Sequence, residues 1–380
     1  MKIAYLTPEY PHIATAPSGG IGTSIRNLTK SLVQKGHQSV IFLYGQKQDK
    51  VWDDEGVTII SIKNVKLKGF SWYFTRRKIE RLINEWFDKG AIQLIEAPDW
   101  TGITAFIRPK KCPVIIRLHG SDTYFCHLDN RKVKRWNRFL EKKALANADA
   151  HISVSAFTAK MTNMLFNQNK TYQIIPNGIV VKDFTSSSSC NNKTLLYFGT
   201  LIRKKGLLEL PLIFNKVIEN CPQAKLILIG RDSTDIISGR SSTWEIMKEL
   251  FSPQAFQNVD YIGGLPYQEV KKHIDQAAVC VFPSFAEALP VSWIEAMVME
   301  KAIVASNIGW ATEMLEHQSS AMLVNPKEHQ AYAAAIVELL ENKEKNIQFG
   351  ENARKIALDK FDQKKIVEKN CEFYSRIINK

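Results

Sequence analysis

Short apolar runs recur along the first half of the chain, separated by longer segments with helical periodicity. The runs span residues 2–7, 39–44, 92–96, 114–118 and 150–154. After a loop over residues 8–22, apolar side chains every three or four positions predict a helix from about Thr23 to Lys35, which Gly36 ends. Strands with so little polar content are typical of a parallel sheet that helices cover on both faces. The alternation therefore predicts a doubly wound α/β domain.

The second half repeats this pattern after a polar, serine-rich stretch at 183–192, which predicts a linker. A length of 380 residues also exceeds what one hydrophobic core usually supports. We therefore expect two α/β domains, residues 1–182 and 193–363, followed by a last helix at about 364–380. The apolar runs that predict the second sheet are residues 194–198, 226–230, 259–263, 279–282 and 302–306.

Composition indicates a cytosolic globular protein without a disulfide framework. Hydrophobic residues make up 45% of the chain, which is ample for two cores, and no apolar run approaches the length that spans a bilayer. The first residues predict a strand that a proline soon follows, which is unlike a signal peptide. The cysteines form no C-x-x-C pair, so we expect reduced thiols and no metal site. They are Cys112, Cys126, Cys190, Cys221, Cys280 and Cys371.

Positive charge is concentrated in the first domain. The net charge is +13, and residues 61–145 hold 19 Lys and Arg against 8 Asp and Glu. Two clusters, residues 63–81 and 131–143, interleave these cations with tryptophan, phenylalanine or tyrosine. Such an amphipathic surface suits anionic lipid headgroups or an anionic acceptor. A solvated basic helix face and a nucleic-acid surface are the alternatives.

Two carboxylates, Glu287 and Glu295, flank the predicted start of a helix near Val291. A strand at 279–282 leads into this loop and helix. Because the amino end of a helix offers unpaired N–H groups and a partial positive charge, a phosphate is a natural occupant. The two acids could then hold the groups that a phosphate links, namely a ribose and a sugar. An ordinary strand–loop–helix unit with solvated acids is the alternative.

Two further segments have the composition of anion-binding turns. Gly20 lies in the run Gly19-Gly20-Ile21-Gly22, where glycines let backbone N–H groups approach an anion closely. The spacing of a G-x-G-x-x-G fingerprint and that of a phosphate loop are both absent. Arg203, Lys204 and Lys205 follow the strand at 194–198. A tight turn and a solvated basic turn are the respective alternatives.

The spacing from Glu287 to Glu295 resembles the E-x7-E signature of family-four retaining glycosyltransferases. Further matches follow the family's order across nearly the whole chain: Gly19-Gly20, His119-Gly120, Ser155, Pro176-Asn177-Gly178, Gly199, Lys205-Gly206 and Gly230. The resemblance implies the GT-B fold, in which two Rossmann-like domains face each other across an active-site cleft. It also implies that the last helix crosses back onto the first domain.

The resemblance assigns the donor site mainly to the second domain. It implies that Glu295 holds the ribose, Glu287 faces the transferred sugar, and Lys205 contacts the diphosphate. The amides of Leu289 and Val291 would serve the sugar and the phosphate. The remaining donor-site residues that it implies are Gly20 against the phosphate, Gly199 beside it, and Gly230 with Ile262 around the base.

Three departures from the family pattern concern this site. Thr200 stands where the family has an arginine, and Arg203 is our candidate for its replacement. Ala288 and Pro290 replace the two glycines of the usual E-G-F-G run, and proline removes one N–H donor. The changes at Ala288 and Pro290 leave the donor sugar open, whereas they do not affect the phosphate site. The base is open because Asp232 stands where the family has a second glycine after Gly230.

The first domain is implied to bind the acceptor. His119, at the end of the strand at 114–118, would lie on the floor of the active site and contact the donor sugar. Glu9, in the loop after the first strand, could orient the acceptor. Because the basic clusters lie in this domain, we rank a membrane or anionic acceptor above nucleic acid, which we do not expect to bind.

The sequence thus predicts a retaining transferase that moves a sugar from a nucleotide diphosphate donor to a hydroxyl of a glycan or glycolipid, as in bacterial surface polysaccharide or lipid-linked glycan assembly. We expect no cofactor, and no metal because the chain lacks a D-x-D motif. The expected location is the cytoplasm or the inner face of the cell membrane. A nucleotide-sugar epimerase or phosphorylase on the same fold, and a non-catalytic binding protein for anionic glycolipid, are the alternatives.

Overall fold

The computed structural model describes residues 1–13, 15, 18–184 and 193–379. It divides into two compact units, Met1–Val180 with Asp362–Lys380, and Val181–Phe361. Most of the linker predicted at 183–192, including Cys190, lies outside the described residues. The other five cysteines are free thiols, and all but Cys371 are buried. No helix in the described part of the chain is long and apolar enough to cross a bilayer.

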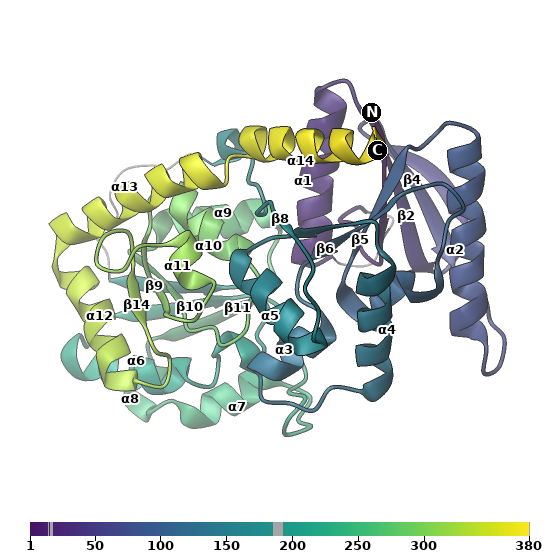
Figure 1. The fold of residues 1–380 in the computed structure, drawn as a ribbon. Coiled ribbons are helices and arrows are strands. Elements are labelled where there is room, and N and C mark those ends of the chain that lie inside the picture. The colour runs from purple at the N-terminus through teal and green to yellow at the C-terminus, as the bar shows by residue number, and fades with distance from the viewer. Residues whose placement is uncertain (14, 16–17, 185–192, 380) are drawn as a thin grey trace. The chain divides into compact units, whose positions relative to one another are not determined.

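Unit 1 is built on an eight-stranded sheet in the order β3-β4-β2-β1-β5-β6-β7-β8 (Figure 1). All neighbouring strands are parallel except β3, which runs antiparallel to β4. The strands are β1 (Lys2–Thr7), β2 (Gln38–Gln46), β3 (Lys50–Asp54), β4 (Val57–Lys63), β5 (Leu94–Pro98), β6 (Val114–Leu118), β7 (Ala150–Ser153) and β8 (Gln173–Ile174). Its helices are α1 (Gly20–Gln34), α2 (Ser71–Asp88), η1 (Trp100–Phe106), α3 (Asp122–Leu128), α4 (Arg135–Asn147), α5 (Ala156–Phe166) and α14 (Gln363–Ile378).

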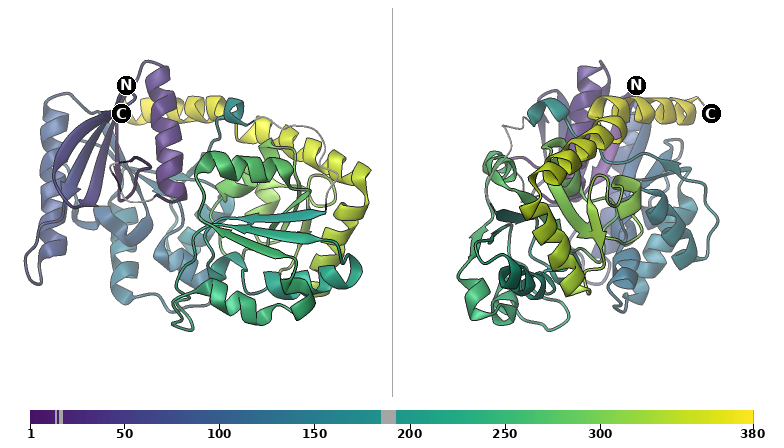
Figure 2. Two further views of the ribbon diagram at one scale, coloured as in Figure 1. Left: turned by 180° about the vertical axis from the view of Figure 1, so that it is seen from behind. Right: turned by 90° about the vertical axis from the view of Figure 1, so that its left-hand side faces the viewer.

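Unit 2 contains a six-stranded parallel sheet in the order β11-β10-β9-β12-β13-β14, which Figure 2 shows from behind. The strands are β9 (Thr194–Phe198), β10 (Lys225–Ile229), β11 (Val259–Gly263), β12 (Val279–Phe282), β13 (Ala302–Ser306) and β14 (Met322–Val324). The helices are η2 (Val181–Asp183), η3 (Arg203–Lys205), α6 (Leu210–Asn220), α7 (Thr243–Leu250), α8 (Pro253–Phe256), α9 (Tyr267–Gln276), α10 (Val291–Val298), α11 (Ala311–Met314), α12 (His329–Glu341) and α13 (Lys343–Lys360). The doubly wound α/β class predicted for both halves is confirmed.

The first helix begins earlier than its apolar periodicity predicts. The predicted start near Thr23 is wrong, because α1 begins at Gly20. The carboxylate of Glu9 accepts hydrogen bonds from the backbone N–H groups of Gly19 (3.0 Å) and Gly22 (2.9 Å). These bonds satisfy donors that a helix start otherwise leaves unpaired. A cap from a residue so far upstream leaves no local signal in the sequence.

The antiparallel pair β3 and β4 was absent from the prediction. Its turn holds Glu55 and Gly56 at φ 55° and φ 85°. Gly56 takes up such a conformation without a Cβ penalty. The fifth strand also differs, since β5 spans Leu94–Pro98 and starts after the predicted Ile92. The apolar run of β4, residues 57–63, is visible in the sequence and was missed, whereas β3 has one buried residue among five and gives a weak signal.

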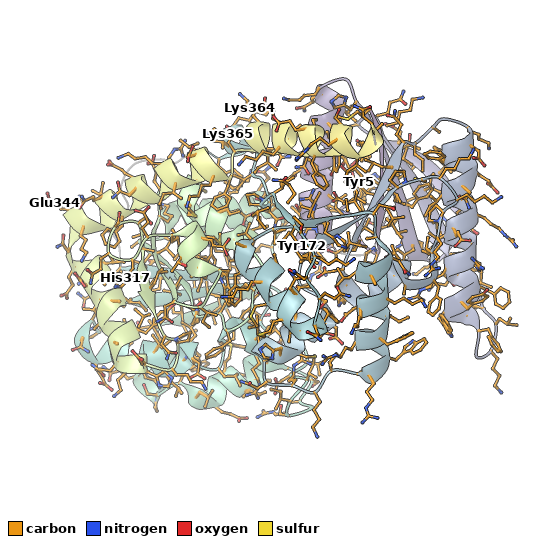
Figure 3. All side chains as sticks on the ribbon, viewed as in Figure 1. Tyr5, Tyr172, His317, Glu344, Lys364 and Lys365 are labelled. Carbon is orange, nitrogen blue, oxygen red and sulfur yellow. The ribbon has the colours of Figure 1, made fainter. Side chains whose placement is uncertain are left out.

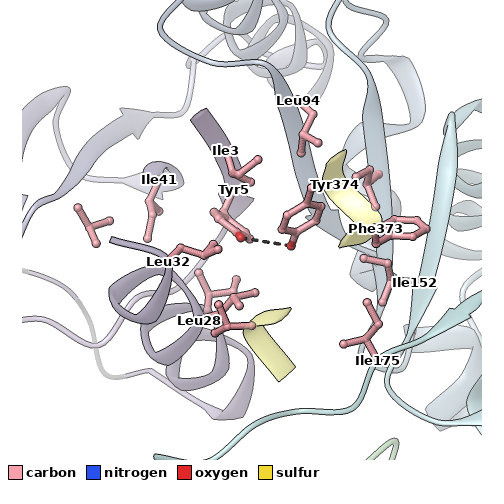
Figure 4. Packing of buried hydrophobic residues seen from close by; sticks show 14 of the residues in the cluster. Ile3, Tyr5, Leu28, Leu32, Ile41, Leu94, Ile152, Ile175, Phe373 and Tyr374 are labelled. Atoms are coloured by element: carbon pink, nitrogen blue, oxygen red, sulfur yellow. Dashed lines mark hydrogen bonds between the residues drawn. The ribbon is translucent and has the colours of Figure 1, made fainter. Parts of the chain in front are cut away.

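The C-terminal helix α14 packs into the core of unit 1. Ile366, Val367 and Phe373 are buried in a cluster with residues of β1, β5 and β7 (Figure 4). The hydroxyl groups of Tyr374 and Tyr5 are hydrogen bonded at 3.2 Å. At the start of the helix, Lys364 and Lys365, labelled in Figure 3, are exposed. This amphipathic helix makes the last residues of the chain part of the first unit.

A buried polar network links α14 to the sheet. The Glu96 carboxylate accepts bonds from the Arg117 guanidinium at 2.7 Å and 3.0 Å and from the Tyr374 hydroxyl at 2.7 Å. The Asn370 side chain of α14 also accepts a bond from Arg117. Because a buried charge is costly unless it is paired and hydrogen bonded, this set of partners stabilises the unit.

Candidate active site

The candidate site of unit 2 lies where its strand order reverses. From β9 the chain continues to β10 and β11 in one direction along the sheet, and from β12 it continues to β13 and β14 in the other. The connections that follow β9 and β12 therefore leave toward opposite faces. Ligands of open α/β sheets bind outside the carboxyl ends of the strands at such a switch point. β9 leads into Gly199 and η3, and β12 leads into the loop 283–290. Both segments that carry the sequence-predicted residues therefore meet at one place.

Backbone contacts hold these two segments together. The carbonyl oxygen of Lys204 accepts hydrogen bonds from the N–H groups of Phe285 (2.8 Å) and Ala286 (3.2 Å). A Cβ on Gly206, which has φ 72°, would lie 1.8 Å from the carbonyl oxygen of Pro283. Glycine is thus required there, because any side chain would separate η3 from the loop 283–290.

A second glycine contact ties together the ends of β9 and β10. A Cβ on Gly230, which has φ 149°, would lie 1.8 Å from the carbonyl oxygen of Gly199. Gly199 itself has φ 145° and donates a hydrogen bond to the carbonyl of Ile229 at 2.8 Å. Gly199 and Gly230, both predicted from the family pattern, therefore shape the carboxyl edge of the sheet.

Lys205 and Glu287 form an ion pair across the two segments. The Lys205 ammonium lies 3.1 Å from Glu287 Oε1, and 21% and 11% of the two side chains are exposed. The Ser284 hydroxyl donates to the same oxygen at 3.3 Å. A nearly buried carboxylate is stabilised by such partners, since an isolated charge in this position would be strongly disfavoured.

Glu295 is buried inside α10 and accepts a hydrogen bond from the Tyr267 hydroxyl at 2.5 Å. Burial raises the pKa of Glu295 to about 7, although Tyr267, Lys271 and Lys205 act in the opposite direction. The Lys271 ammonium lies 4.9 Å from the ring centre of Tyr267. The carboxyl group therefore titrates near neutral pH, where a hydrogen-bonding ligand or a cation can shift its charge.

The amino end of α10 is open to an anion by its chemistry. The helix starts at Val291, as predicted, after Pro290, with no side-chain cap and no acidic residue in its first turn. Its first N–H groups have no carbonyl partner within the helix, and the helix dipole places partial positive charge there. Leu289, just before this start, is 6% exposed. Helix starts of this kind are common places for a phosphate to bind.

Arg203 is held by a carboxylate that the sequence did not indicate. Its guanidinium donates to both oxygens of Asp235 at 2.8 Å and 2.7 Å. These hydrogen bonds, together with bonds from Ser238, hold the pKa of Asp235 well below its usual range. The backbone carbonyl at Thr200, the position of the family's arginine, accepts a bond from the Tyr197 hydroxyl at 3.0 Å. Arg203 thus lies in the same turn as Lys205, and its guanidinium is paired with the Asp235 carboxylate.

The third strand end of this edge carries aromatic side chains. The Tyr261 hydroxyl donates to the carbonyl oxygen of Gly230 at 3.0 Å, and its ring centre lies 4.9 Å from that of Trp244. The next residue, Ile262, is 40% exposed. Apolar and aromatic surface next to backbone polar groups is typical of a site for a nucleobase.

In unit 1 the strand order reverses between β1 and β5. Glu9 follows β1, and both of its carboxylate oxygens bind the turn before α1, as described above. Gly22 is confined there, since an added Cβ would lie 2.0 Å from the Ser18 hydroxyl, whereas a Cβ on Gly20 would meet nothing within 4 Å. Glu9 is therefore a structural partner of the glycine turn, and Gly20 is its open position.

His119 follows β6, and the carboxylate of Asp99, which follows β5, accepts its backbone N–H at 2.9 Å. Burial, with a smaller contribution from Arg117, lowers the pKa of His119 to about 3. Burial also raises the pKa of Asp99 to about 7. His119 is consequently a neutral imidazole at physiological pH, suited to hydrogen bonding and not to proton donation.

Sequence reasoning thus placed two groups of residues. Unit 2 brings together Lys205, Glu287 and Glu295, and unit 1 holds the other candidates, Glu9, Gly20 and His119. The contacts from Tyr267, Asp235, Ser284 and Asp99 were missed. Only Asp99 had a usable signal, because an acid directly after a buried strand next to the switch point lies at the ligand edge. The described residues contain no group of three or more His, Cys, Asp or Glu side chains placed to hold a metal ion.

Two family models divide the chain between them. The model described as "Glycosyl transferases group 1" matches residues 182–356 and includes the Glu287–Glu295 segment. The model described as "Glycosyltransferase Family 4" matches residues 18–183. Together they account for most of both structural units.

Individual proteins match at low identity. An uncharacterised glycosyltransferase of Methanocaldococcus jannaschii is 22% identical, covering 98% of each chain. A GDP-mannose-dependent mannosyltransferase of Corynebacterium glutamicum, named for its monoacylated phosphatidylinositol monomannoside substrate, is 23% identical over 53% of this chain and 55% of its own. The structure of HepE from Anabaena in complex with UDP and glucose superimposes with a TM-score of 0.76 at 20% identity, covering 99% of both chains. This similarity identifies the fold as GT-B.

Proposed function

Because the chain belongs to the group 1 glycosyltransferases, we propose that it transfers a sugar from a nucleotide diphosphate donor to a hydroxyl of a glycan or lipid-linked acceptor, with retention of the anomeric configuration. Unit 2 binds the donor and unit 1 binds the acceptor. The observation that carries the proposal is the meeting of Lys205, Glu287 and the open start of α10 at the switch point of unit 2.

The donor diphosphate binds at the amino end of α10. The N–H groups at the start of the helix and the Lys205 ammonium provide the positive charge that a diphosphate requires. Glu295 accepts hydrogen bonds from the ribose hydroxyls, and Glu287 faces the transferred sugar. The burial of Glu287 and Glu295 supports these roles, because a buried carboxyl group is costly unless hydrogen-bond donors such as sugar hydroxyls pair with it.

The chemistry consists of one bond exchange on one face of the sugar. The bond between the anomeric carbon and the phosphate oxygen breaks, and the acceptor oxygen forms the new bond to the same carbon. The acceptor proton passes to the departing phosphate. This exchange needs no enzymic nucleophile, and Glu287, whose Oε1 contacts Lys205 and Ser284, serves to orient the sugar. Lys205 and the helix dipole stabilise the charge that develops on the leaving group.

The residues of unit 1 complete the proposal. His119, neutral because of its burial, supplies a hydrogen bond and not a proton. A Cβ on Gly20 would meet no atom within 4 Å, so a ligand can approach the backbone closely there. The lack of a D-x-D motif supports transfer without a cofactor or divalent metal. The free cysteines support a cytoplasmic location, and the basic surface of unit 1 supports action at the inner face of the membrane, in surface polysaccharide or lipid-linked glycan assembly.

Two measurements test this function. A panel of nucleotide sugars is first screened for the donor that raises the thermal midpoint, since a ligand that binds only the folded state stabilises it. The reaction with that donor and an acceptor extract is then followed by proton NMR at the anomeric position. Retained configuration in a glycoside product is expected. Release of an epimer, of sugar 1-phosphate, or of no product from a bound donor would refute the proposal.

A further inference from the structure

An aromatic cluster joins three segments of unit 1 that are distant in sequence. The Trp72 ring of α2 lies 5.4 Å from Phe106 of η1 and 5.3 Å from Trp136 of α4. Trp136 in turn stacks on Phe139 at 5.4 Å. We call Trp72, Phe106, Trp136 and Phe139 the aromatic cluster. Its rings come from the two basic segments of the sequence and from the short helix between them.

The packing beneath this cluster fixes it firmly. Gly102 in η1 has φ 56°, and a Cβ there would lie 2.3 Å from the backbone of Leu140 in α4. The buried carboxylate of Glu141 binds the N–H groups of Asp122 (2.8 Å) and Thr101 (3.2 Å). The α4 helix is thus held against η1 on one side. Trp136 and Phe139 lie in the first turns of the same helix, and the Phe139 ring lies 6.4 Å from that of Phe106 in η1.

Large parts of these rings are nevertheless exposed. Trp136 and Phe139 are 49% and 47% exposed, and Phe70 and Phe74 at the start of α2 are 60% and 42% exposed. Tyr73 connects Phe74 to the cluster, since its ring lies 5.5 Å from Phe74 and 5.8 Å from Trp72. Single exposed apolar residues are ordinary, but several connected exposed rings are unusual for a surface that contacts only water. The rigid support and the exposure together indicate a surface built to contact something apolar.

Cations surround this apolar surface. Residues 63–81 and 131–143 each hold seven Lys or Arg and one acid. Lys143 lies 4.5 Å from the ring centre of Phe106. Nine exposed cations of these segments have no carboxylate within ion-pair distance among the residues the structure describes, and six of them flank the exposed rings in sequence. These six are Lys66, Lys68, Lys132, Lys134, Arg135 and Lys142.

The structure also removes some cations from this surface. Arg76 is buried and donates to the carbonyl oxygens of Gly102 and Trp72, so its charge faces the interior. Arg77 pairs with Glu80 at 2.6 Å, and Lys78 pairs with Asp49 at 2.6 Å. Most of the unpaired positive charge therefore lies in the segment before α2 and before and along α4, and Arg81 is an exposed cation of α2 without an ion pair among the described residues.

We infer that this surface, the aromatic cluster with Phe70, Phe74 and the six flanking cations, docks the protein on an anionic lipid bilayer. Tryptophan and phenylalanine rings enter the boundary between headgroups and acyl chains, while lysine and arginine bind the lipid phosphates. Two tryptophans in mutual contact suit this boundary better than a nucleic acid, which would need flat rings free to stack on bases. The inference rests on the proposed function only in that a lipid-linked acceptor would lie in the same membrane.

The first test is sedimentation of the full chain with sucrose-loaded vesicles of phosphatidylglycerol and phosphatidylcholine in equal parts, at low and high salt. Wild type is expected to bind these vesicles and to bind pure phosphatidylcholine much less. Trp136→Ala/Phe139→Ala is expected to weaken the partition about tenfold or more, because it removes two inserted rings. Met164→Ala, which changes a 58% exposed apolar residue of α5, is the matched control and should bind as wild type does.

The second test concerns charge. Lys134→Glu/Arg135→Glu places acids at the start of α4, where the helix dipole favours them, so folding should persist. Each lost cation is expected to weaken binding to the anionic vesicles about fivefold, and each added acid should weaken it further. Lys343→Glu/Lys355→Glu makes the same charge change on exposed positions of α13 and should have little effect.

Insertion has its own readout, which depends on no enzymatic activity. Vesicles with brominated acyl chains quench tryptophan that enters the boundary, and Trp136→Phe should lose a large part of this quenching. Failure of wild type to bind anionic vesicles, or equal binding by the surface and control variants, would overturn the inference. So would binding to single-stranded RNA in preference to vesicles. A transfer assay with a soluble acceptor analogue separates this inference from the proposed function. The surface variants should keep this transfer activity whether or not they still bind vesicles.

Discussion

Replacement of Lys205 by alanine separates the catalytic role of this residue from its structural one. In the structure the Lys205 ammonium lies 3.1 Å from Glu287, whose side chain is only 11% exposed. Removing one member of a buried ion pair costs about 3–5 kcal/mol, because the remaining charge loses its partner. Since 21% of the Lys205 side chain is exposed, water screens the pair, and we expect a loss of about 1–3 kcal/mol in the free energy of unfolding.

The expected effect on the reaction is larger than this loss of stability. Loss of one group that stabilises charge in the transition state typically lowers kcat by about 10²–10³-fold, or about 3–4 kcal/mol. The protein should remain folded at 25 °C, so the lower rate cannot be attributed to unfolding. Steady-state kinetics with the donor identified by thermal shift, together with urea unfolding, gives both quantities for the same preparation.

A double variant makes the distinction sharp. Lys205→Ala/Glu287→Gln leaves no unpaired buried charge, so its free energy of unfolding should return toward that of wild type while kcat stays low. Lys204→Ala removes a neighbouring cation of the same turn and should change kcat only slightly. Recovery of the rate together with stability in the double variant, or full activity of Lys205→Ala, would refute the reasoning.

Three further predictions concern other sites. Burial raises the pKa of Glu295 from 4.5 to about 7, so between these pH values the folded state keeps a proton that the unfolded state has lost. The free energy of unfolding should therefore fall by about 3 kcal/mol as pH rises from 4.5 to 7. Glu295→Gln should flatten this part of the pH–stability profile, and an unchanged slope would contradict the prediction. Glu9→Ala leaves the N–H groups of Gly19 and Gly22 without their acceptor and should cost about 1–2 kcal/mol in urea unfolding, with Glu9→Gln intermediate. Treatment with EDTA should leave the transfer rate unchanged, and rescue of a lost rate by Mg²⁺ or Mn²⁺ would contradict metal independence.

The apolar pattern predicts most of the fold because parallel strands buried on both faces need nearly continuous apolar runs. The runs at 114–118 and 279–282 coincide with β6 and β12. The edge strand β3, by contrast, has one buried residue among five, so its sequence pattern is weak, whereas the apolar run of β4 was visible and was missed. The start of α1 depends on Glu9, a contact that forms only once the loop has folded.

The candidate site divides in the same way. Gly206 and Gly230 were identified in the sequence from the family pattern. The structure gives the physical reason, because a Cβ at either position would overlap a backbone carbonyl oxygen. The partners of charged groups were not identified, since Asp235 reaches Arg203 from a different loop and Tyr267 reaches Glu295 from a different helix. A run of residues indicates which segments meet, whereas the pairing of individual side chains depends on how those segments pack.

The central claim is that a nucleoside diphosphate binds at the start of α10. A crystal structure of the protein grown with the diphosphate of the preferred donor tests it most directly. We predict phosphate density within hydrogen-bond distance of the first N–H groups of α10 and of the Lys205 ammonium, with the ribose beside Glu295. A ligand bound elsewhere, with that helix start left empty at saturating concentration, would contradict the account.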